Sequence, residues 1–291
     1  MITEYNSYAK INIGLHILRK RDDGYHDIET TFKLIDLHDR IQIEPAKERS
    51  VITSNRSDVP TDEANIALKA VRLLERKTGK ALHVRIHIEK NIPMGAGLGG
   101  GSSNGATVLT ALNNLFQLNL SGKDLLQQAA LLGSDVPFFT GFMLGLGTTA
   151  FGQGRGERLE FFRWNLSEKV ILVYPKTSIS TAWAYQNYKK YKDLEASEKT
   201  KNTLTNRGVS VILSAPLTKK TFFDNDFEPL VFANHDQIRL LRQSLAEQGA
   251  VFSSLSGSGS TVFGLFESDA DLAFSSDWFP GTDVYACNFV N

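Results

Sequence analysis

The chain has 291 residues, 42% of them hydrophobic, which is enough apolar content for two ordinary domains or one large one. Its 32 lysines and arginines balance 32 aspartates and glutamates, so there is no cationic surplus to attract nucleic acid or an anionic membrane. A single cysteine, Cys287, excludes an internal disulfide and a thiolate metal cluster, and the N-terminal residues lack an export signal, so we expect a cytoplasmic protein.

The first predicted elements are strands. Three stretches carry strand-like patterns of apolar residues, at residues 8–17, 28–43 and 82–89. In the first stretch, alternation with a period of two places Lys10 and Asn12 together on one face. The second stretch is expected to form one or two strands, broken near the polar residues Asp36 to Asp39.

Helices are predicted from capping signals and apolar periodicity. One is expected to start at Thr61 and to stop at Gly79, and a second is expected to follow Ser103. A third starts with a capping box at Ser121 and ends at Gly133. Because a single strand separates the first two helices and none separates the second from the third, the order favours an α+β protein over regular βαβ alternation.

Residues 136–154 carry no charge and approach the length of a membrane span, but their five glycines and polar side chains favour buried strands with glycine turns. Further on, a strand, a polar surface segment, a helix and a strand pair are predicted at residues 170–174, 189–207, 235–248 and 251–266. The turn cluster at residues 152–157 predicts a domain boundary, giving domains 1–155 and 156–291.

A glycine-rich loop at residues 93–103 leads from the most regular strand into a helix. Such a loop lets backbone N–H groups converge on an anion at a helix N-terminus, so it predicts a phosphate site. It lacks the lysine of a P-loop. Gly95, Gly97 and Gly100 match the dinucleotide pattern, but the next element is a helix and Asp124 suits the start of that helix, which argues against hydride transfer.

Several motifs occur in the order expected for one kinase superfamily. Residues 93–103 resemble the ATP loop of the galactokinase, homoserine kinase, mevalonate kinase and phosphomevalonate kinase superfamily, and residues 255–261 resemble its third motif. Residues 9–15 with 23–26, and residues 133–139, resemble the 4-diphosphocytidyl-2-C-methyl-D-erythritol kinases of the non-mevalonate isoprenoid pathway. The extra glycines Gly100 and Gly101 favour this branch of the superfamily.

The resemblance implies an α+β fold with an N-terminal ribosomal-protein-S5-like domain, a C-terminal ferredoxin-like domain, and the active site between them. It also implies ATP-dependent phosphorylation of the 2-hydroxyl of 4-diphosphocytidyl-2-C-methyl-D-erythritol, with ATP and Mg²⁺ as cofactors. The sequence leaves open whether the protein is a monomer or a homodimer. A mevalonate-like or homoserine-like kinase is the alternative. A non-catalytic RNA or nucleotide binder is a third hypothesis, against which the zero net charge argues.

By the same resemblance, Lys10 and Asp135 are the catalytic pair, with Asp135 as the general base; a solvated lysine and a helix N-cap are the plain alternatives. The resemblance assigns ATP to Asn65 and to the loop residues Pro93, Met94, Gly95, Ala96, Gly97, Leu98, Gly99, Gly100, Gly101, Ser102 and Ser103. It assigns the alcohol substrate to Asn12, Tyr25, His26, Thr181, Tyr185, Gly257, Ser258 and Gly259. Trp183 remains a rival of Tyr185 for the second aromatic face at the base, and no protein carboxylate is assigned to the metal ion.

Overall fold

The computed structural model describes residues 2–188, 208–217, 223–270 and 279–291. By internal packing the chain forms two units: unit 1 holds residues 1–9, 37–94 and 99–147, and unit 2 holds residues 10–36, 95–98 and 148–291. Strands β1 (Thr3–Lys20) and β2 (His26–Pro45) contribute residues to both units. The boundary between residues 155 and 156 therefore remains a prediction, and the predicted polar segment at 189–207 lies outside the described residues.

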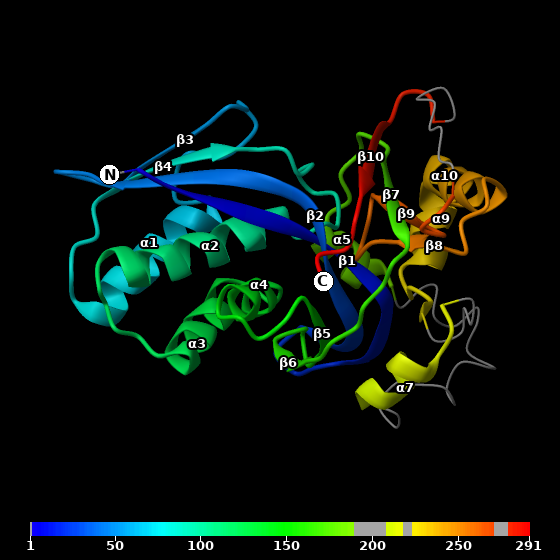
Figure 1. Cartoon of the computed structure of the whole chain (residues 1–291), viewed down its shortest axis with the longest axis horizontal. Helices are drawn as coiled ribbons and strands as arrows, with labels where there is room; N and C mark the ends of the chain where they lie inside the picture. The colour runs from blue at the N-terminus through cyan, green and yellow to red at the C-terminus, as the bar shows by residue number, and fades with distance from the viewer. Residues whose placement is uncertain (1, 189–207, 218–222, 271–278) are drawn as a thin grey trace. The chain divides into compact units, whose positions relative to one another are not determined.

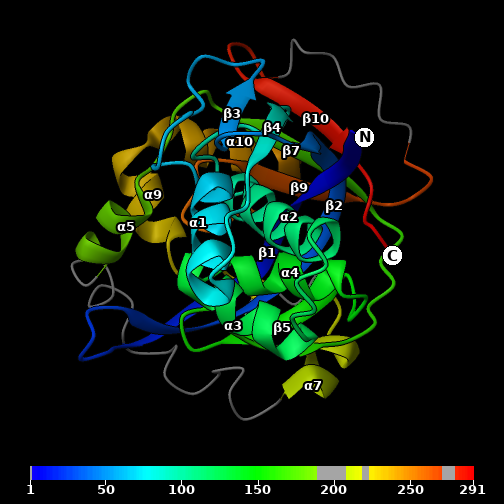
Figure 2. The same ribbon diagram turned by 90° about the vertical axis from the view of Figure 1, so that its left-hand side faces the viewer.

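Unit 1 combines a small sheet with helices. Its further elements are β3 (Val51–Ser54), α1 (Ile66–Thr78), β4 (Val84–Glu89), α2 (Gly100–Leu115), α3 (Gly122–Leu132) and α4 (Val136–Met143). Residues 40–45 of β2 pair antiparallel with β4, and β3 pairs parallel with the other edge of β4. The helices lie on one face of these strands (Figure 1), and α1 and α2 pack side by side (Figure 2).

The first helix begins later than the sequence predicted. Helix α1 starts at Ile66 rather than after Thr61, because Asn65 is its N-cap and accepts a hydrogen bond from the N–H of Ala67 at 2.9 Å. The residues after Thr61 instead form a separate turn, in which the carbonyl of Asp62 accepts from the N–H of Asn65 at 3.0 Å. An Asn N-cap is as favourable as Ser or Thr, so the local signal was ambiguous.

The predicted end of α1 and both predicted ends of α3 are confirmed. Gly79 ends α1 with a φ of 69°, the left-handed conformation that glycine adopts without strain. Ser121 and Asp124 form the predicted capping box of α3, and Gly133 is its C-cap.

The second predicted helix begins within the glycine loop. Helix α2 starts at Gly100, not after Ser103, and Gly99 is its N-cap with a φ of 72°. A Cβ on Gly100 would lie 2.8 Å from Nζ of Lys90 and 2.9 Å from Cγ2 of Ile92. Gly100 therefore allows the first turn of α2 to pack closely against the segment that follows β4.

The prediction that the uncharged segment 136–154 forms strands alone is wrong. It begins with α4, and a strand, β5 (Thr149–Gln153), follows. Residues 136–141 are all buried, so α4 lacks the amphipathic pattern that reveals a surface helix. In the described part of the chain no helix is both long enough and apolar enough to cross a membrane.

Strand β2 is continuous, so the predicted break near Asp36 to Asp39 is wrong. Each of these acidic side chains has partners that keep it within the strand. The carboxylate of Asp36 accepts from the backbone and side-chain nitrogens of Asn288, both at 2.9 Å. The carboxylate of Asp39 accepts from the N–H groups of Asn91 and Ile92, both at 2.8 Å.

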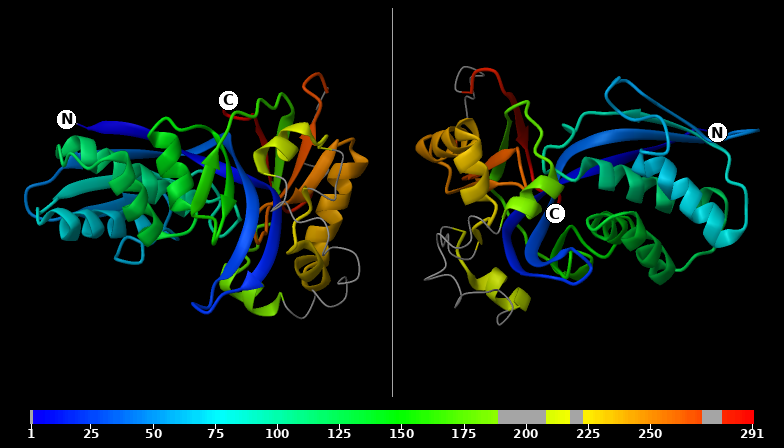
Figure 3. Two further views of the ribbon diagram at one scale, coloured as in Figure 1. Left: turned by 90° about the horizontal axis from the view of Figure 1, so that it is seen from below. Right: turned by 180° about the vertical axis from the view of Figure 1, so that it is seen from behind.

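Unit 2 contains a four-stranded antiparallel sheet with the order β10-β7-β9-β8. Its elements after β5 are β6 (Arg158–Phe161), β7 (Lys169–Tyr174), α5 (Thr181–Asn187), α7 (Gly208–Ser214), α9 (Glu228–Asn234), α10 (Asp236–Glu247), β8 (Phe252–Leu255), β9 (Val262–Phe266) and β10 (Asp283–Cys287). Numbered by their order in the chain, the strands lie across this sheet as fourth, first, third and second, which is the order of ferredoxin-like domains. Helix α10 packs on strands β8 and β9 (Figure 3). The predictions at 170–174, 235–248 and 251–266 are confirmed.

Candidate active site

A buried polar cluster surrounds Lys10 in unit 2. Lys10 is 3% exposed, and its Nζ donates to Oδ1 of Asn12 at 2.5 Å and to the carbonyl of Gly97 at 3.0 Å. Nδ2 of Asn12 donates in turn to Oγ1 of Thr30 at 2.8 Å. The burial excludes the plain alternative of a solvated strand lysine. The period-two pattern of β1 explains why both side chains lie on one face.

The third motif packs directly on this cluster. Gly97 has a φ of 80°, and a Cβ on it would lie 2.0 Å from the carbonyl oxygen of Ser256. The hydroxyl of Ser256 donates to the Gly97 carbonyl at 3.0 Å. A Cβ on Gly257 would lie 3.3 Å from Oδ1 of Asn12 and 3.6 Å from Nζ of Lys10. Glycine is required at both positions, because the two loops and the lysine approach closely.

Two of the residues assigned to the base lie against each other. The rings of His26 and Tyr185 stack with centroids 5.1 Å apart and an interplanar angle of 18°. Trp183, the rival aromatic residue, packs edge-on against His235 with centroids 5.9 Å apart. The structure therefore brings Tyr185, rather than Trp183, beside the predicted base-binding segment.

Helix α5 also contacts the third motif. Oγ1 of Thr181 and Oγ of Ser258 are 3.0 Å apart, within hydrogen-bonding distance. Thr181 and Tyr185 are four residues apart on α5, so they lie on the same face of the helix. A chain of contacts thus runs from His26 through α5 to the third motif and Lys10, all within unit 2.

Tyr25 lies at the tip of the connection between β1 and β2. It is 52% exposed, and the guanidinium of Arg155 lies over its ring, 4.7 Å from the centroid. The N–H of Arg21 donates to the Tyr25 carbonyl at 2.8 Å, and the N–H of Tyr25 donates to Oδ1 of Asp23 at 3.1 Å. Sequence reasoning missed Arg155, because it took the turn cluster around that residue as a domain boundary.

Charged groups stabilise the same connection. The hydrogen bond from Arg21 lowers the pKa of Asp23, and hydrogen bonds from Arg19 and then Arg21 lower the pKa of Asp27. These carboxylates therefore stay ionised at neutral pH, and the ion pairs brace the segment that carries Tyr25.

A second buried polar network lies under the first turn of α2, in unit 1. The fully buried carboxylate of Asp39 accepts from Nζ of Lys90 and, at 2.8 Å, from Nδ2 of Asn104. Asn104 also donates to Oγ of Ser7 at 2.9 Å, and this hydroxyl donates to Oγ of Ser103 at 2.7 Å. Burial lowers the pKa of Lys90, while the nearby Asp39 opposes that shift. No sequence motif revealed this network.

The two predicted loop serines have different surroundings. Ser103 is buried and held by Ser7, whereas Ser102 is half-buried at the start of α2. Asn65 caps α1, and the residue after it, Ile66, lies where a Cβ on Gly101 would contact its side chain at 3.7 Å. Ile66, the residue after Asn65, therefore lies beside the first turn of α2.

Asp135 occupies the N-cap position of α4, with a φ of −86° and a ψ of −16°. Within this fully described helix and its cap, the Asp135 side chain makes no hydrogen bond to the N–H groups of the first turn. Side-chain capping therefore does not account for this carboxylate. Lys10 belongs to unit 2 and Asp135 to unit 1, and their catalytic pairing stays a prediction.

Comparisons with known proteins decide the family. Models described as "GHMP kinases N terminal domain" and "GHMP kinases C terminal" match residues 65–141 and 213–276. A 4-diphosphocytidyl-2-C-methyl-D-erythritol kinase of Chloroherpeton thalassium is 40% identical over 264 residues, which cover 91% of this chain and 89% of the relative. The same enzyme of Chlorobium chlorochromatii is 41% identical over 276 residues, which cover 95% of this chain and 92% of the relative.

The chain belongs to the 4-diphosphocytidyl-2-C-methyl-D-erythritol kinase family. A crystal structure of a 4-(cytidine 5'-diphospho)-2C-methyl-D-erythritol kinase superposes with a TM-score of 0.78 at 29% identity, covering 99% of this chain and 100% of that chain. The fold is thus the two-domain α+β kinase fold that the sequence predicted, and the chain is an ATP-dependent small-molecule kinase. These relatives do not favour a mevalonate-like or homoserine-like kinase.

Across the described ranges, no group of three or more His, Cys, Asp or Glu side chains is arranged to hold a metal ion. Mg²⁺ prefers hard oxygen donors, and the half-buried Ser102 hydroxyl is one such donor at the start of α2.

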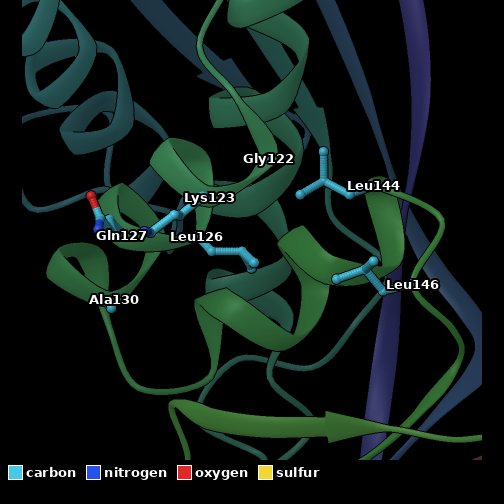
Figure 4. Close-up of a pocket in the computed structure, with 7 residues that line it drawn as sticks. All are labelled: Gly122, Lys123, Leu126, Gln127, Ala130, Leu144 and Leu146. Carbon is cyan, nitrogen blue, oxygen red and sulfur yellow. The ribbon is translucent and has the colours of Figure 1, made fainter.

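Unit 1 also has an apolar hollow of about 640 Å³ beside α3, shown in Figure 4. Its lining residues are Gly122, Lys123, Leu126, Gln127, Ala130, Leu144 and Leu146. None of these described residues belongs to the predicted site. The hollow is therefore not the candidate active site.

Proposed function

We propose that this chain transfers the γ-phosphoryl group of ATP to the 2-hydroxyl of 4-diphosphocytidyl-2-C-methyl-D-erythritol. The observation that carries the substrate assignment is the chain of contacts in unit 2. It links the stacked rings of His26 and Tyr185, through Thr181 and Ser258, to the buried ammonium of Lys10. A flat aromatic surface with polar edges suits a nucleobase, and a buried lysine ammonium suits phosphate.

In the proposed mechanism, Asp135 accepts the proton of the attacking 2-hydroxyl. Lys10 stabilises negative charge on the attacking oxygen and the transferred group, and Asn12 fixes the direction of the Lys10 ammonium through its 2.5 Å hydrogen bond. Phosphoryl transfer needs little covalent chemistry from the protein, so positioning and charge stabilisation supply most of the rate.

The proposed nucleotide site is the loop from Pro93 to Ser103, with Asn65 beside it. The left-handed Gly99 and the start of α2 at Gly100 present free N–H groups of a helix N-terminus, which favour phosphate. Mg²⁺ would be held by the nucleotide phosphates and the Ser102 hydroxyl, and when bound it would offset phosphate charge.

The proposed substrate site uses both aromatic and glycine-rich segments. Tyr25 and Tyr185 would stack on the cytosine, and His26 would hydrogen-bond its edge. The third-motif residues Gly257 to Gly259 would face the substrate phosphates, and Thr181 would make a polar contact. We further propose a cytoplasmic monomer or homodimer without a nucleic-acid partner, consistent with a net charge of zero.

The test is ADP release measured with a coupled assay for the cytidylated polyol, the uncytidylated polyol, mevalonate and homoserine. We expect turnover of the cytidylated substrate; equal turnover of mevalonate or homoserine would overturn the assignment. Asp135→Asn should lower kcat by about 10²- to 10⁴-fold with unchanged ATP affinity. Asp124→Asn, a matched change at the cap of α3, should leave kcat near wild type. A near wild-type kcat for Asp135→Asn would contradict its role as base.

A further inference from the structure

A segment that matches none of the sequence motifs lies along β1 in unit 2. The N–H of Leu15 donates to the carbonyl of Asp224 at 3.0 Å, and the N–H of Asp226 donates to the carbonyl of Leu15 at 2.8 Å. Between these bonds, Asn225 pairs with Leu15 as an isolated parallel bridge. The segment is thus hydrogen-bonded to β1, the strand that also carries Lys10, five residues before Leu15.

The side chain of Asn225 is fully used within the protein. It is 2% exposed, and its Nδ2 donates to the carbonyls of Leu255 at 2.8 Å and Gly257 at 2.7 Å. Its Oδ1 accepts from the N–H of Phe227 at 2.9 Å. An amide group has two donor hydrogens, so both are committed to the loop of the third motif.

Holding the Gly257 carbonyl also fixes the direction of the next donor. The peptide bond between Gly257 and Ser258 is trans, so its C=O and N–H point in opposite directions. With the carbonyl directed at Asn225, the N–H of Ser258 points away from Asn225. A Cβ on Gly257 would lie 3.6 Å from Nζ of Lys10, so this peptide lies beside the Lys10 ammonium.

We propose that Asn225 is a positioning residue of the kinase reaction. It orients the Gly257–Ser258 peptide so that the Ser258 N–H, together with Lys10, faces an anionic oxygen of the alcohol substrate. This inference rests on the proposed function for the identity of that substrate. The alternative is that Asn225 braces the fold without affecting the substrate.

The experiment compares Asn225→Ala and Asn225→Asp with Asn113→Ala. Asn113 is a matched control, because its amide also braces a loop, accepting from the N–H of Leu120 at 3.0 Å and donating to the Leu120 carbonyl at 3.3 Å. Asn113 lies in unit 1, at the end of α2, and outside every proposed binding set. Near-UV circular dichroism selects conditions in which all variants are folded.

We expect Asn225→Ala to lower kcat/KM for the cytidylated substrate by about 10- to 100-fold while KM for ATP changes less than about twofold. Asn113→Ala should change neither constant. Asn225→Asp loses both donors when ionised and regains one when protonated, so its activity relative to wild type should rise as the pH falls. Equal kinetics of Asn225→Ala and Asn113→Ala would overturn the inference.

A second measurement separates this inference from the proposed function. Hydrogen–deuterium exchange of residues 255–261, without substrate, should be faster in Asn225→Ala than in wild type and unchanged in Asn113→Ala. Failure of the wild type to phosphorylate the cytidylated substrate would refute the proposed function, whereas the exchange result tests whether Asn225 orders this loop, which the positioning role requires. Unchanged exchange in Asn225→Ala would refute that role.

Discussion

Asp39→Asn tests the buried network under the first turn of α2. The carboxylate accepts from four donors: Nζ of Lys90, Nδ2 of Asn104, and the N–H groups of Asn91 and Ile92. The two backbone donors meet Oδ1, and the two side-chain donors meet Oδ2. An amide of the same size keeps one acceptor oxygen, so its NH₂ group must face either the two backbone donors or the two side-chain donors.

The expected loss follows from the bonds removed. If the retained oxygen serves the backbone pair, two charge-assisted hydrogen bonds are lost, each worth about 1.5–3 kcal/mol. The loss of these hydrogen bonds and the loss of the partner of the Lys90 ammonium are the same event, so their energies are not added. Because breaking a buried ion pair costs about 3–5 kcal/mol, we expect Asp39→Asn to lower the free energy of unfolding by about 3–5 kcal/mol. Lys90→Met should lower the free energy of unfolding by about 2 kcal/mol, because the carboxylate keeps three of its donors.

The loss should also depend on pH. Burial lowers the pKa of Lys90 and Asp39 opposes this, so Asp39→Asn should lower that pKa further. A lysine with a lower pKa in the folded state binds fewer protons there than in the unfolded state, and stability then rises with pH. The difference in free energy of unfolding between wild type and Asp39→Asn should therefore narrow as the pH rises from about 7 toward 10, near the pKa of a lysine in the unfolded chain.

Urea denaturation, followed by circular dichroism at pH 7 and pH 9.5, measures these differences. Asp124→Asn, which changes an exposed capping residue, is the control and should lose about 1 kcal/mol or less. The reasoning is refuted if Asp39→Asn is no less stable than Lys90→Met, or if its deficit widens with pH.

Two further predictions concern unit 2. Burial lowers the pKa of Lys33 to about 8, so wild type should gain about 2.5 kcal/mol relative to Lys33→Met between pH 8 and the unfolded pKa of about 10.4. Urea denaturation at pH 7.5 and 10 measures this gain, and a constant difference would contradict the shift. Tyr185→Leu should raise KM for the cytidylated substrate by about tenfold, and Trp183→Leu should not; steady-state kinetics that reverse this order would exchange their roles.

The features predicted from sequence are those fixed by neighbouring residues. The capping box at Ser121 and the left-handed Gly79 act within one helical turn, so the sequence carries their whole signal. The alternation of β1 likewise placed Lys10 and Asn12 on one face, and the structure joins them by a hydrogen bond.

The errors arose where distant residues decide the local structure. Helix α2 starts early because Gly100 packs on Lys90 and Ile92, a contact that the loop itself does not encode. Strand β2 continues through Asp39 because the carboxylate meets donors from another part of the chain. Buried acids with long-range partners look like turn residues in a sequence.

The same distinction applies to the candidate site. Residues assigned by resemblance lie in recognisable motifs, whereas Asn225 and Arg155 were missed because their relevance depends on the loops they contact. Asn225 bonds to Gly257, 32 positions away, and Arg155 covers Tyr25 at a sequence distance that no local pattern reports. A polar residue in a segment without a motif becomes informative only when its partners are known.

The zero net charge now has a structural counterpart. In unit 1, the ammonium of Lys90 is matched by the carboxylate of Asp39, so this pair adds no net charge beneath the predicted phosphate loop. In unit 2, Lys10 donates to the oxygens of Asn12 and Gly97, which hold the ammonium in place. Placed cations and oriented N–H groups act over a few ångströms, whereas a general cationic field would attract any polyanion. A kinase for a phosphate-rich small molecule gains selectivity from this arrangement, because the attraction depends on an oxygen reaching the donors rather than on the total charge of the ligand.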